Sequence, residues 1–130
     1  MSTSYTISED VQGDFDEVVE KTIRELEDEG FGVLCDIDVR ATLKKKLDEE
    51  FRNYRILGAC NPGFAHQALE EEIELGTLLP CNVIVYENDD GTVTVSAINP
   101  GRMLSITGND DLESIAEEVH ARFERVLENL

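Results

Sequence analysis

The sequence predicts an α+β fold in which helices pack on one face of an antiparallel sheet. Two observations carry this prediction. Residues 15–26 and 112–130 repeat apolar side chains at positions i, i+3 and i+4, which places those side chains along one side of a helix. Between these helices, residues 81–86 and 92–98 alternate apolar and polar side chains, as strands do, and residues 88–91 (NDDG) form a hairpin signal between them. We therefore expect the apolar sides of the two helices to pack on a sheet. Because a hairpin connects two of its strands, the sheet is expected to be antiparallel.

The first third of the chain predicts a strand, a helix and a second strand. Residues 4–8 are a short strand candidate. A capping box that begins at Asp14 starts the first long helix, and Gly30 is its stop signal. The next strand, over residues 31–38, has an apolar face made of Phe31, Val33, Cys35 and Ile37. We therefore expect Cys35 to be a buried packing residue.

A second, shorter helix is predicted over residues 38–49. Its inward-facing side chains would be Val39, Leu43 and Leu47. The lysine run at residues 44–46 is the only basic cluster in the chain. It is interpreted as a solvated helix face; the alternatives are an anion site or a contact with an acidic surface of a second subunit.

The central stretch, ILGACNPGFAHQALEEEIELGTLLPCN, is the place where chemistry or ligand binding could sit. A strand over residues 54–60 ends at Cys60, and Asn61 and Pro62 are the preferred residue types for the N-cap and the first position of a helix. Gly76 is the predicted end of that helix. Because Cys60 lies just before a helix N-terminus, the exposed N–H groups and the helix dipole would favour its thiolate form.

The C-terminal third predicts the hairpin and a final helix. After the second hairpin strand, residues 99–101 (NPG) break the sheet, and residues 102–106 are predicted to be a short extended piece or an irregular loop. The final helix opens at Asp110 with a capping-box pattern and carries a long apolar stripe. His120 lies beside that stripe among glutamates, so we expect a surface histidine.

The length of 130 residues indicates one domain over residues 1–130. No run of apolar residues is long enough for a membrane helix, and the first residues lack the pattern of a signal peptide, so a cytoplasmic protein is expected. The 29 acidic and 11 basic residues give a net charge of −18, which is typical of proteins from halophiles. The same charge makes nucleic acids and anionic membranes improbable partners, because both need clustered Lys and Arg.

Three hypotheses arise for the central stretch. In the first, Cys60 is a nucleophile or redox centre, Cys81 resolves it, and His66 could approach as a base. In the second, Cys60, Cys81 and His66 bind zinc or another soft metal, with no evident fourth ligand. In the third, the domain is a binding or interaction module for an unknown small ligand or a second subunit, without chemistry of its own. Asn61 and Asn82 would then either line the ligand site or bond backbone groups at strand ends. Whether the protein is an enzyme stays open.

Cys60 and Cys81 are each followed by Asn and each meet a turn or a helix start. We therefore predict that the two thiols lie near one another at one edge of the sheet, within about 7 Å, the upper limit for the Cα atoms of a bridgeable pair.

The motifs ILGACNP and LLPCNVIVYE, separated by an Ala- and Glu-rich helix, resemble the bacterial and archaeal family known as domain of unknown function 302. The resemblance extends over most of the chain. It implies a compact α+β fold with an antiparallel sheet, similar to the TATA-binding-protein-like architecture, and a homodimer. It implies no catalytic mechanism.

Overall fold

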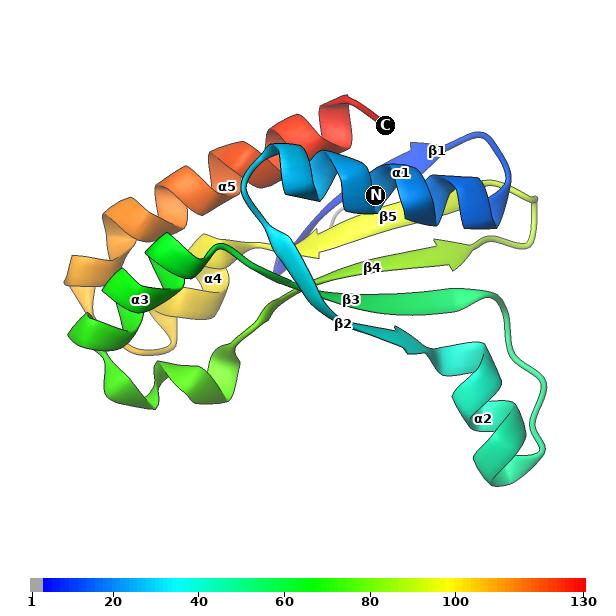
Figure 1. The fold of residues 1–130 in the computed structure, drawn as a ribbon, viewed down its shortest axis with the longest axis horizontal. Coiled ribbons are helices and arrows are strands. Elements are labelled where there is room, and N and C mark those ends of the chain that lie inside the picture. The colour runs from blue at the N-terminus through cyan, green and yellow to red at the C-terminus, as the bar shows by residue number, and fades with distance from the viewer. Residues whose placement is uncertain (1–3) are drawn as a thin grey trace.

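The computed structural model describes residues 4–130, which form one antiparallel sheet of five strands (Figure 1). The strands lie in the order β1-β5-β4-β3-β2, so the first two strands of the chain occupy opposite edges. Their bounds are Thr6–Val11 for β1, Gly32–Asp38 for β2, Tyr54–Cys60 for β3, Cys81–Glu87 for β4 and Val93–Ile98 for β5. The predicted α+β class with an antiparallel sheet is confirmed.

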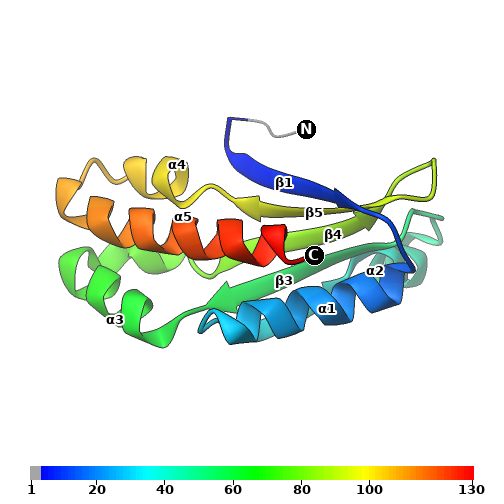
Figure 2. The ribbon, with the colours of Figure 1, turned by 90° about the horizontal axis from the view of Figure 1, so that it is seen from above.

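Helices cover one face of this sheet. The long helices α1 and α5 lie side by side across it, and α3 and α4 lie beyond the strand ends near the first half of α5 (Figures 1 and 2). The helix α2 projects from the β2 edge, on the side of the sheet away from α1 and α5 (Figure 1). The bounds are Phe15–Asp28 for α1, Val39–Leu47 for α2, Pro62–Glu71 for α3, Pro100–Ser105 for α4 and Glu113–Glu128 for α5, with short 3₁₀ turns η1 at Ile73–Leu78 and η2 at Asp110–Leu112. Within residues 4–130 no helix packs across the opposite side of the sheet, which we call the open face.

The N-terminal elements follow the predicted order with one shift of boundary. The first strand was predicted over residues 4–8, but β1 begins at Thr6 and continues to Val11. Hydrogen bonding with β5 sets the ends of β1, because every residue from Thr6 to Val11 has a partner on β5. The helix α1 begins as predicted, since Asp14 caps it by accepting a hydrogen bond from the Glu17 backbone N–H at 3.2 Å.

The hydrophobic core consists of two clusters. The larger one lies between the sheet and the helices α1 and α5, and its centre includes Leu57, Val85 and Val95, which are fully buried. The smaller one lies among α3, α4 and the start of α5, and it consists of Ala68, Leu75, Met103, Leu104, Leu112 and Ala116. Cys81 packs against both clusters. The end of β4 at which Cys81 lies is therefore the junction of the two cores.

The corner between β2 and α2 differs from the prediction. Cys35 is exposed, so its predicted burial is wrong. A register shift between Val33 and Cys35 is the reason: Val33 remains half-buried on the core side, while Cys35 pairs with Gly58 on the open face. The predicted inward face of α2 is also wrong, because α2 has no buried residue and Leu47 is 65% exposed. Apolar spacing alone could not bury these side chains, since no element covers them.

Two boundaries in the second half also differ. The helix α3 ends at Glu71, and Gly76, its predicted stop, lies inside the turn η1. Residues 102–106 were predicted to be extended or irregular, but most of them belong to α4. Asn99 caps α4 by accepting a hydrogen bond from the Gly101 backbone N–H at 3.0 Å, so the Asn-Pro pair starts a helix here.

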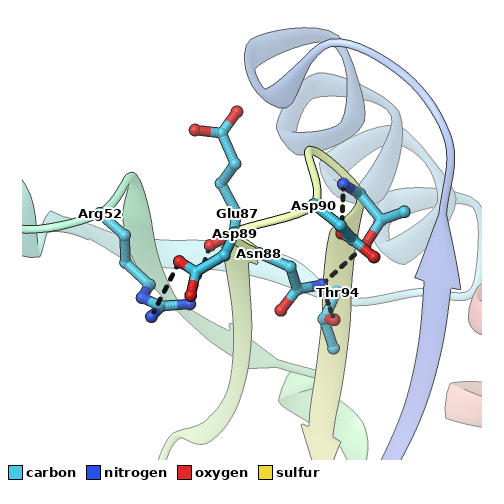
Figure 3. A network of polar contacts seen from close by, with 7 residues as sticks. Arg52, Glu87, Asn88, Asp89, Asp90 and Thr94 are labelled. Carbon is cyan, nitrogen blue, oxygen red and sulfur yellow. Dashed lines mark hydrogen bonds and ion pairs between the residues drawn. The ribbon is translucent and has the colours of Figure 1, made fainter.

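The hairpin between β4 and β5 lies where it was predicted, although β4 ends and β5 begins one residue later than predicted. Its turn holds a network of side-chain hydrogen bonds (Figure 3). Asn88 donates from Nδ2 to the hydroxyl of Thr92 at 3.0 Å and to that of Thr94 at 2.8 Å. Asp90 accepts from both the backbone N–H and the hydroxyl of Thr92, which lowers the pKa of its carboxyl. Gly91 supplies the positive φ, at 87°, that the turn requires.

Candidate functional site

The structure brings Cys60 and Cys81 to one place. Ala59, next to Cys60, is the cross-strand partner of Cys81, and both cysteine residues line one small cavity of about 40 Å³. We call it the cysteine cavity. Its other lining residues are Phe31, Ala59, Asn61, Phe64, Ala65, Ala68, Leu75, Leu79, Pro80, Pro100, Met103, Leu104, Ile115 and Val119. Most of these residues are apolar.

Burial sets the protonation of Cys81. It raises the pKa of the Cys81 thiol from 9.0 to about 11, and the neighbouring Cys60 adds to the shift. A thiol with this pKa is almost fully protonated at neutral pH, which is the opposite of an activated nucleophile. The electrostatic influence of Cys60 on Cys81 also agrees with the predicted proximity of the two side chains.

Asn61 and Asn82 have different positions. Asn61 is the N-cap of α3, as predicted, and its Oδ1 accepts a hydrogen bond from the Phe64 backbone N–H at 3.2 Å. Its Nδ2 lies beside Gly30, where φ is 88° and a Cβ would come within 3.0 Å of that nitrogen. Asn82 is exposed and pairs with Gly58 on the open face. Asn61 therefore supports the cavity wall, while Asn82 lies outside it.

His66 does not join the cysteines. Its side chain is 75% exposed, and its Nε2 lies 2.9 Å from a carboxylate oxygen of Glu70, one turn along α3. Among residues 4–130, no three side chains of His, Cys, Asp or Glu are placed to hold a metal ion. The zinc set predicted from Cys60, Cys81 and His66 is therefore not assembled, because the helical periodicity of α3 turns His66 toward solvent.

Cys35 lies near the cysteine cavity but on the open face. A Cβ built on Gly58 would be 2.6 Å from Cys35 Sγ and 2.9 Å from Pro80 Cγ. Pro80 therefore separates the two environments, since it covers Gly58 and also lines the cysteine cavity.

A second cavity, of about 550 Å³, lies between α4 and α5, and the sequence analysis did not predict it. We call it the α4/α5 cavity. Its lining residues are Asn99, Gly101, Leu104, Ser105, Gly108, Asn109, Asp110, Leu112, Glu113, Ala116, Glu117, His120, Ala121 and Glu124. The missed signal was the Asn99-Pro100 pair, which has the same helix-start chemistry as Asn61-Pro62. Without α4, the prediction had nothing to form the second wall.

His120 is the notable polar group of the α4/α5 cavity. Its Nδ1 lies 2.6 Å from a carboxylate oxygen of Glu124, and its side chain is 32% exposed. Asp110, Glu113 and Glu117 add further carboxylates to the lining, and the lining contains no Lys or Arg. The predicted surface histidine is thus a partly buried member of a cavity wall.

These features define a class of protein: a small α+β domain with an antiparallel sheet, a helix layer on one face and cavities at the end of that layer. The model of the family "Domain of unknown function DUF302" matches residues 7–130, so the chain belongs to this family. A solved structure supports the assignment: the chain is similar to the "uncharacterized conserved protein DUF302 from Bacillus stearothermophilus", with 28% identity, a TM-score of 0.90, and coverage of 97% of this chain and 98% of that one. No curated protein matches.

Among the described residues, no helix is long and apolar enough to cross a membrane.

Proposed function

We propose that this domain is a small-ligand-binding module and that the α4/α5 cavity is its binding site. The observation that carries the proposal is the cavity volume of about 550 Å³. Ligand sites typically have volumes of roughly 300–1,000 Å³ and combine apolar walls with a few polar groups. Leu104, Leu112 and Ala116 supply the apolar wall, and the pair of His120 and Glu124 supplies a polar one.

The charge of the lining sets the class of ligand. Four carboxylates and no guanidinium or ammonium group face the α4/α5 cavity, so a phosphate or carboxylate ligand would have no counter-charge. An amine or a hydroxyl group has donors for the carboxylates, and an apolar tail has the leucine wall. The proposed ligand is therefore neutral or cationic, with an apolar part and at least one donor.

A matched set of probes tests this proposal: hexylamine, hexanol and hexanoate, which share one apolar chain. We expect hexylamine and hexanol to shift the amide NMR signals of α4 and α5 with affinities around millimolar, and hexanoate to leave them unchanged. Ala121→Phe fills the cavity from the half-buried face of α5 and should abolish the shifts. Ala41→Phe, at an exposed position of α2, is the control and should leave them intact. Shifts with no probe, or shifts that survive Ala121→Phe, would contradict the proposal.

A second proposed role is self-association through the open face, which supports the expected homodimer. Ile37, Ile56 and Ile84 are cross-strand neighbours there, and Ile37 is 45% exposed. Tyr54 stacks on Tyr86 beside this row, with ring centroids 5.6 Å apart. Such an apolar strip is typical of a surface that a partner covers.

Light scattering in concentrated potassium chloride tests the homodimer. The monomer has a mass of 14.6 kDa, and we expect about twice that value. Ile37→Glu on the open face should return the monomer mass, whereas Ile106→Glu, at a 72% exposed site beyond the strands, should not. A monomer in the unsubstituted chain would remove the homodimer without affecting the ligand proposal.

The cellular setting that we propose is the cytoplasm of a salt-adapted organism. The support is the net charge of −18, because concentrated salt reduces the range of charge repulsion to a few ångströms. Thermal unfolding should therefore show a midpoint that rises from low to multimolar potassium chloride, and a constant midpoint would contradict this reading. The same charge supports the absence of nucleic-acid affinity, which duplex binding at physiological salt would overturn.

A further inference from the structure

The helix α2 differs from the other helices because nothing covers it. Within residues 4–130, the helices α1, α3, α4 and α5 each bury at least one side chain, whereas α2 buries none. It has only nine residues, and helices shorter than about 12–15 residues are marginal in water unless their apolar side packs on something. The helix therefore has the properties of an element whose packing partner lies outside the chain.

Hydrogen bonds hold α2 where it projects from the edge of the sheet (Figure 1). The strand β2 ends at Asp38 and α2 begins at the next residue, so no linker separates them. The Asp38 carboxylate accepts from the Ala41 backbone N–H at 2.9 Å, and the Thr42 hydroxyl donates to the Asp38 carbonyl oxygen at 2.8 Å. Arg40 Nη1 donates to Asn53 Oδ1 at 3.1 Å. These bonds keep α2 from folding back over the open face of its own chain.

The apolar side of α2 matches the apolar strip of the open face in size. Val39, Leu43 and Leu47 repeat at a spacing of four, which places them along one side of the helix. Nine residues at 1.5 Å each give a helix length of about 13 Å. The strip crosses the neighbouring strands β2, β3 and β4, which lie about 4.8 Å apart and so span about 10 Å between the outer two. One α2 helix is therefore long enough to lie across the strip.

The charge of α2 indicates which partner fits. Four of the 11 basic residues of the chain lie on this helix, and none of the 29 acidic residues does. Lys44 pairs with Asp48 at 2.8 Å and with Glu50 at 3.0 Å. Lys45 and Lys46 have no ion-pair partner within residues 4–130. A nucleic acid would be repelled by the net charge of −18, whereas a second copy offers carboxylates to the lysines and an apolar strip to the helix.

We propose that α2 is a dimerisation arm: the apolar side of α2 from one copy packs on the apolar strip of a second copy. A two-fold axis repeats this contact, so each copy covers both its helix and its strip at once. Val39, Leu43 and Leu47 then contact the isoleucine row, and the lysines at residues 45–46 approach carboxylates of the second copy. This inference rests on the proposed self-association through the open face and names the element that covers that face.

Light scattering of Leu47→Asp over a range of concentrations in concentrated potassium chloride tests the arm. Leu47 is 65% exposed, so the substitution places a charge in the proposed contact without disturbing the core of the chain. We expect the dimer dissociation constant to rise about 30-fold or more, as for a hot-spot residue of an interface. Ile73→Asp introduces the same charge at an 82% exposed site on η1 and should leave the dimer intact. A dimer of unchanged stability after Leu47→Asp would overturn the arm.

Photo-cross-linking identifies the surface that α2 contacts. Replacing Leu47 by p-benzoylphenylalanine keeps its apolar character, and ultraviolet light should then yield a covalent dimer of twice the 14.6 kDa monomer mass. Digestion of that dimer should locate the cross-link in β3 or β4 of the second copy. A cross-link to α1, α2 or α5 of the second copy, or no covalent dimer, would overturn the inference.

Charge reversal tests the lysine contact, at the lowest salt concentration at which circular dichroism shows the folded chain. Lys46→Glu should weaken the dimer about tenfold, whereas Arg24→Glu, at an exposed position of α1, should not. Equal effects of the two reversals would overturn the contact between the lysines and the second copy. A monomer in the unsubstituted chain would remove the proposed homodimer as well, whereas a dimer that survives Leu47→Asp removes only the arm. None of these outcomes bears on the α4/α5 cavity.

Discussion

The two faces of the sheet are made by the same strands, but one face is buried under helices and the other is open. On the covered face, Leu57, Val85 and Val95 are fully buried under α1 and α5. One residue along the same strands, Ile56 and Ser96 lie on the open face. Successive side chains along each strand point to opposite faces, so both faces receive side chains in the same way. The helix layer determines which face becomes the core.

The open face is itself divided. Its half on β2, β3 and β4 is apolar and aromatic, as the isoleucine row and the stacked tyrosines show. Its half on β5 and β1 is polar, and the polar groups bond to one another: the Ser8 and Ser96 hydroxyls lie 2.8 Å apart, and the Thr94 hydroxyl donates to Asp10 at 2.7 Å. The polar half needs no partner, whereas the apolar half gains free energy if one covers it.

The largest expected difference between the faces is the loss of unfolding free energy caused by Leu57→Ala compared with the loss caused by Ile56→Ala. Leu57 is fully buried, so its truncation leaves a cavity and should cost about 2–5 kcal/mol of the free energy of unfolding. Ile56 is half-buried on the open face, and its truncation should cost roughly 1 kcal/mol in the monomer. Urea unfolding in concentrated salt measures both. Equal losses would show that the open face is as tightly packed as the covered one.

The next prediction concerns the ionisation of the Cys81 thiol on the covered face. The folded-state pKa of Cys81 is about 11, above its unfolded value of 9.0. Below pH 9 both states hold the proton and little stability is lost. Between pH 9 and 11 the unfolded state ionises more readily than the folded state, so stability falls as pH rises, by about 2 kcal/mol at pH 11. The difference in unfolding free energy between the unsubstituted chain and Cys81→Ser, followed from pH 8 to 11, isolates this loss. A flat difference for Cys81→Ser would show that Cys81 ionises as readily in the folded state as in the unfolded state.

The sequence predicted the covered face better than the open one. The helix α1 and the strand β3 were predicted closely, because a continuous apolar stripe or alternation coincides with strong cap and turn residues. Cys35 and Leu47 were misjudged because their apolar spacing is real but no element covers them. Periodicity records which side of an element is apolar; it contains no information on what lies opposite.

The candidate site shows the same limit. Cys60 and Cys81 could be predicted as neighbours, since each lies at the end of a strand. Met103 could not, because it reaches the cavity only through α4, and α4 was predicted as a loop. His120 was interpreted from the glutamates on its own helix, but its role in the α4/α5 cavity depends on α4 as well. Contacts between distant segments decide both sites.

Gly58→Ala is a smaller test, at a position where Cys35 and Pro80 cover the open face. Gly58 is buried beneath Cys35 and Pro80, and an added Cβ would clash with both. We expect Gly58→Ala to cost about 1–3 kcal/mol of unfolding free energy, because the proline ring cannot rotate away. Gly76→Ala, where a Cβ meets no atom within 4 Å, is the control and should be neutral or slightly stabilising. Adding Cys35→Ala to Gly58→Ala should recover part of the loss; no recovery would assign the whole clash to Pro80.

The smallest expected effect concerns the hydroxyl pair of Ser8 and Ser96. Ser96→Ala should cost about 1 kcal/mol, because it removes a hydrogen bond and leaves the half-buried Ser8 hydroxyl to find water. Removing both hydroxyls should cost less than the two single losses added together, since neither is then left without its partner. A double-mutant cycle by urea unfolding measures this coupling. If a second subunit also covered the polar half, water could not reach the Ser8 hydroxyl. The cost of Ser96→Ala would then approach the roughly 1–3 kcal/mol of a buried group without a hydrogen-bond partner. A value near 1 kcal/mol that does not change with protein concentration would therefore confine any dimer contact to the apolar half of the open face.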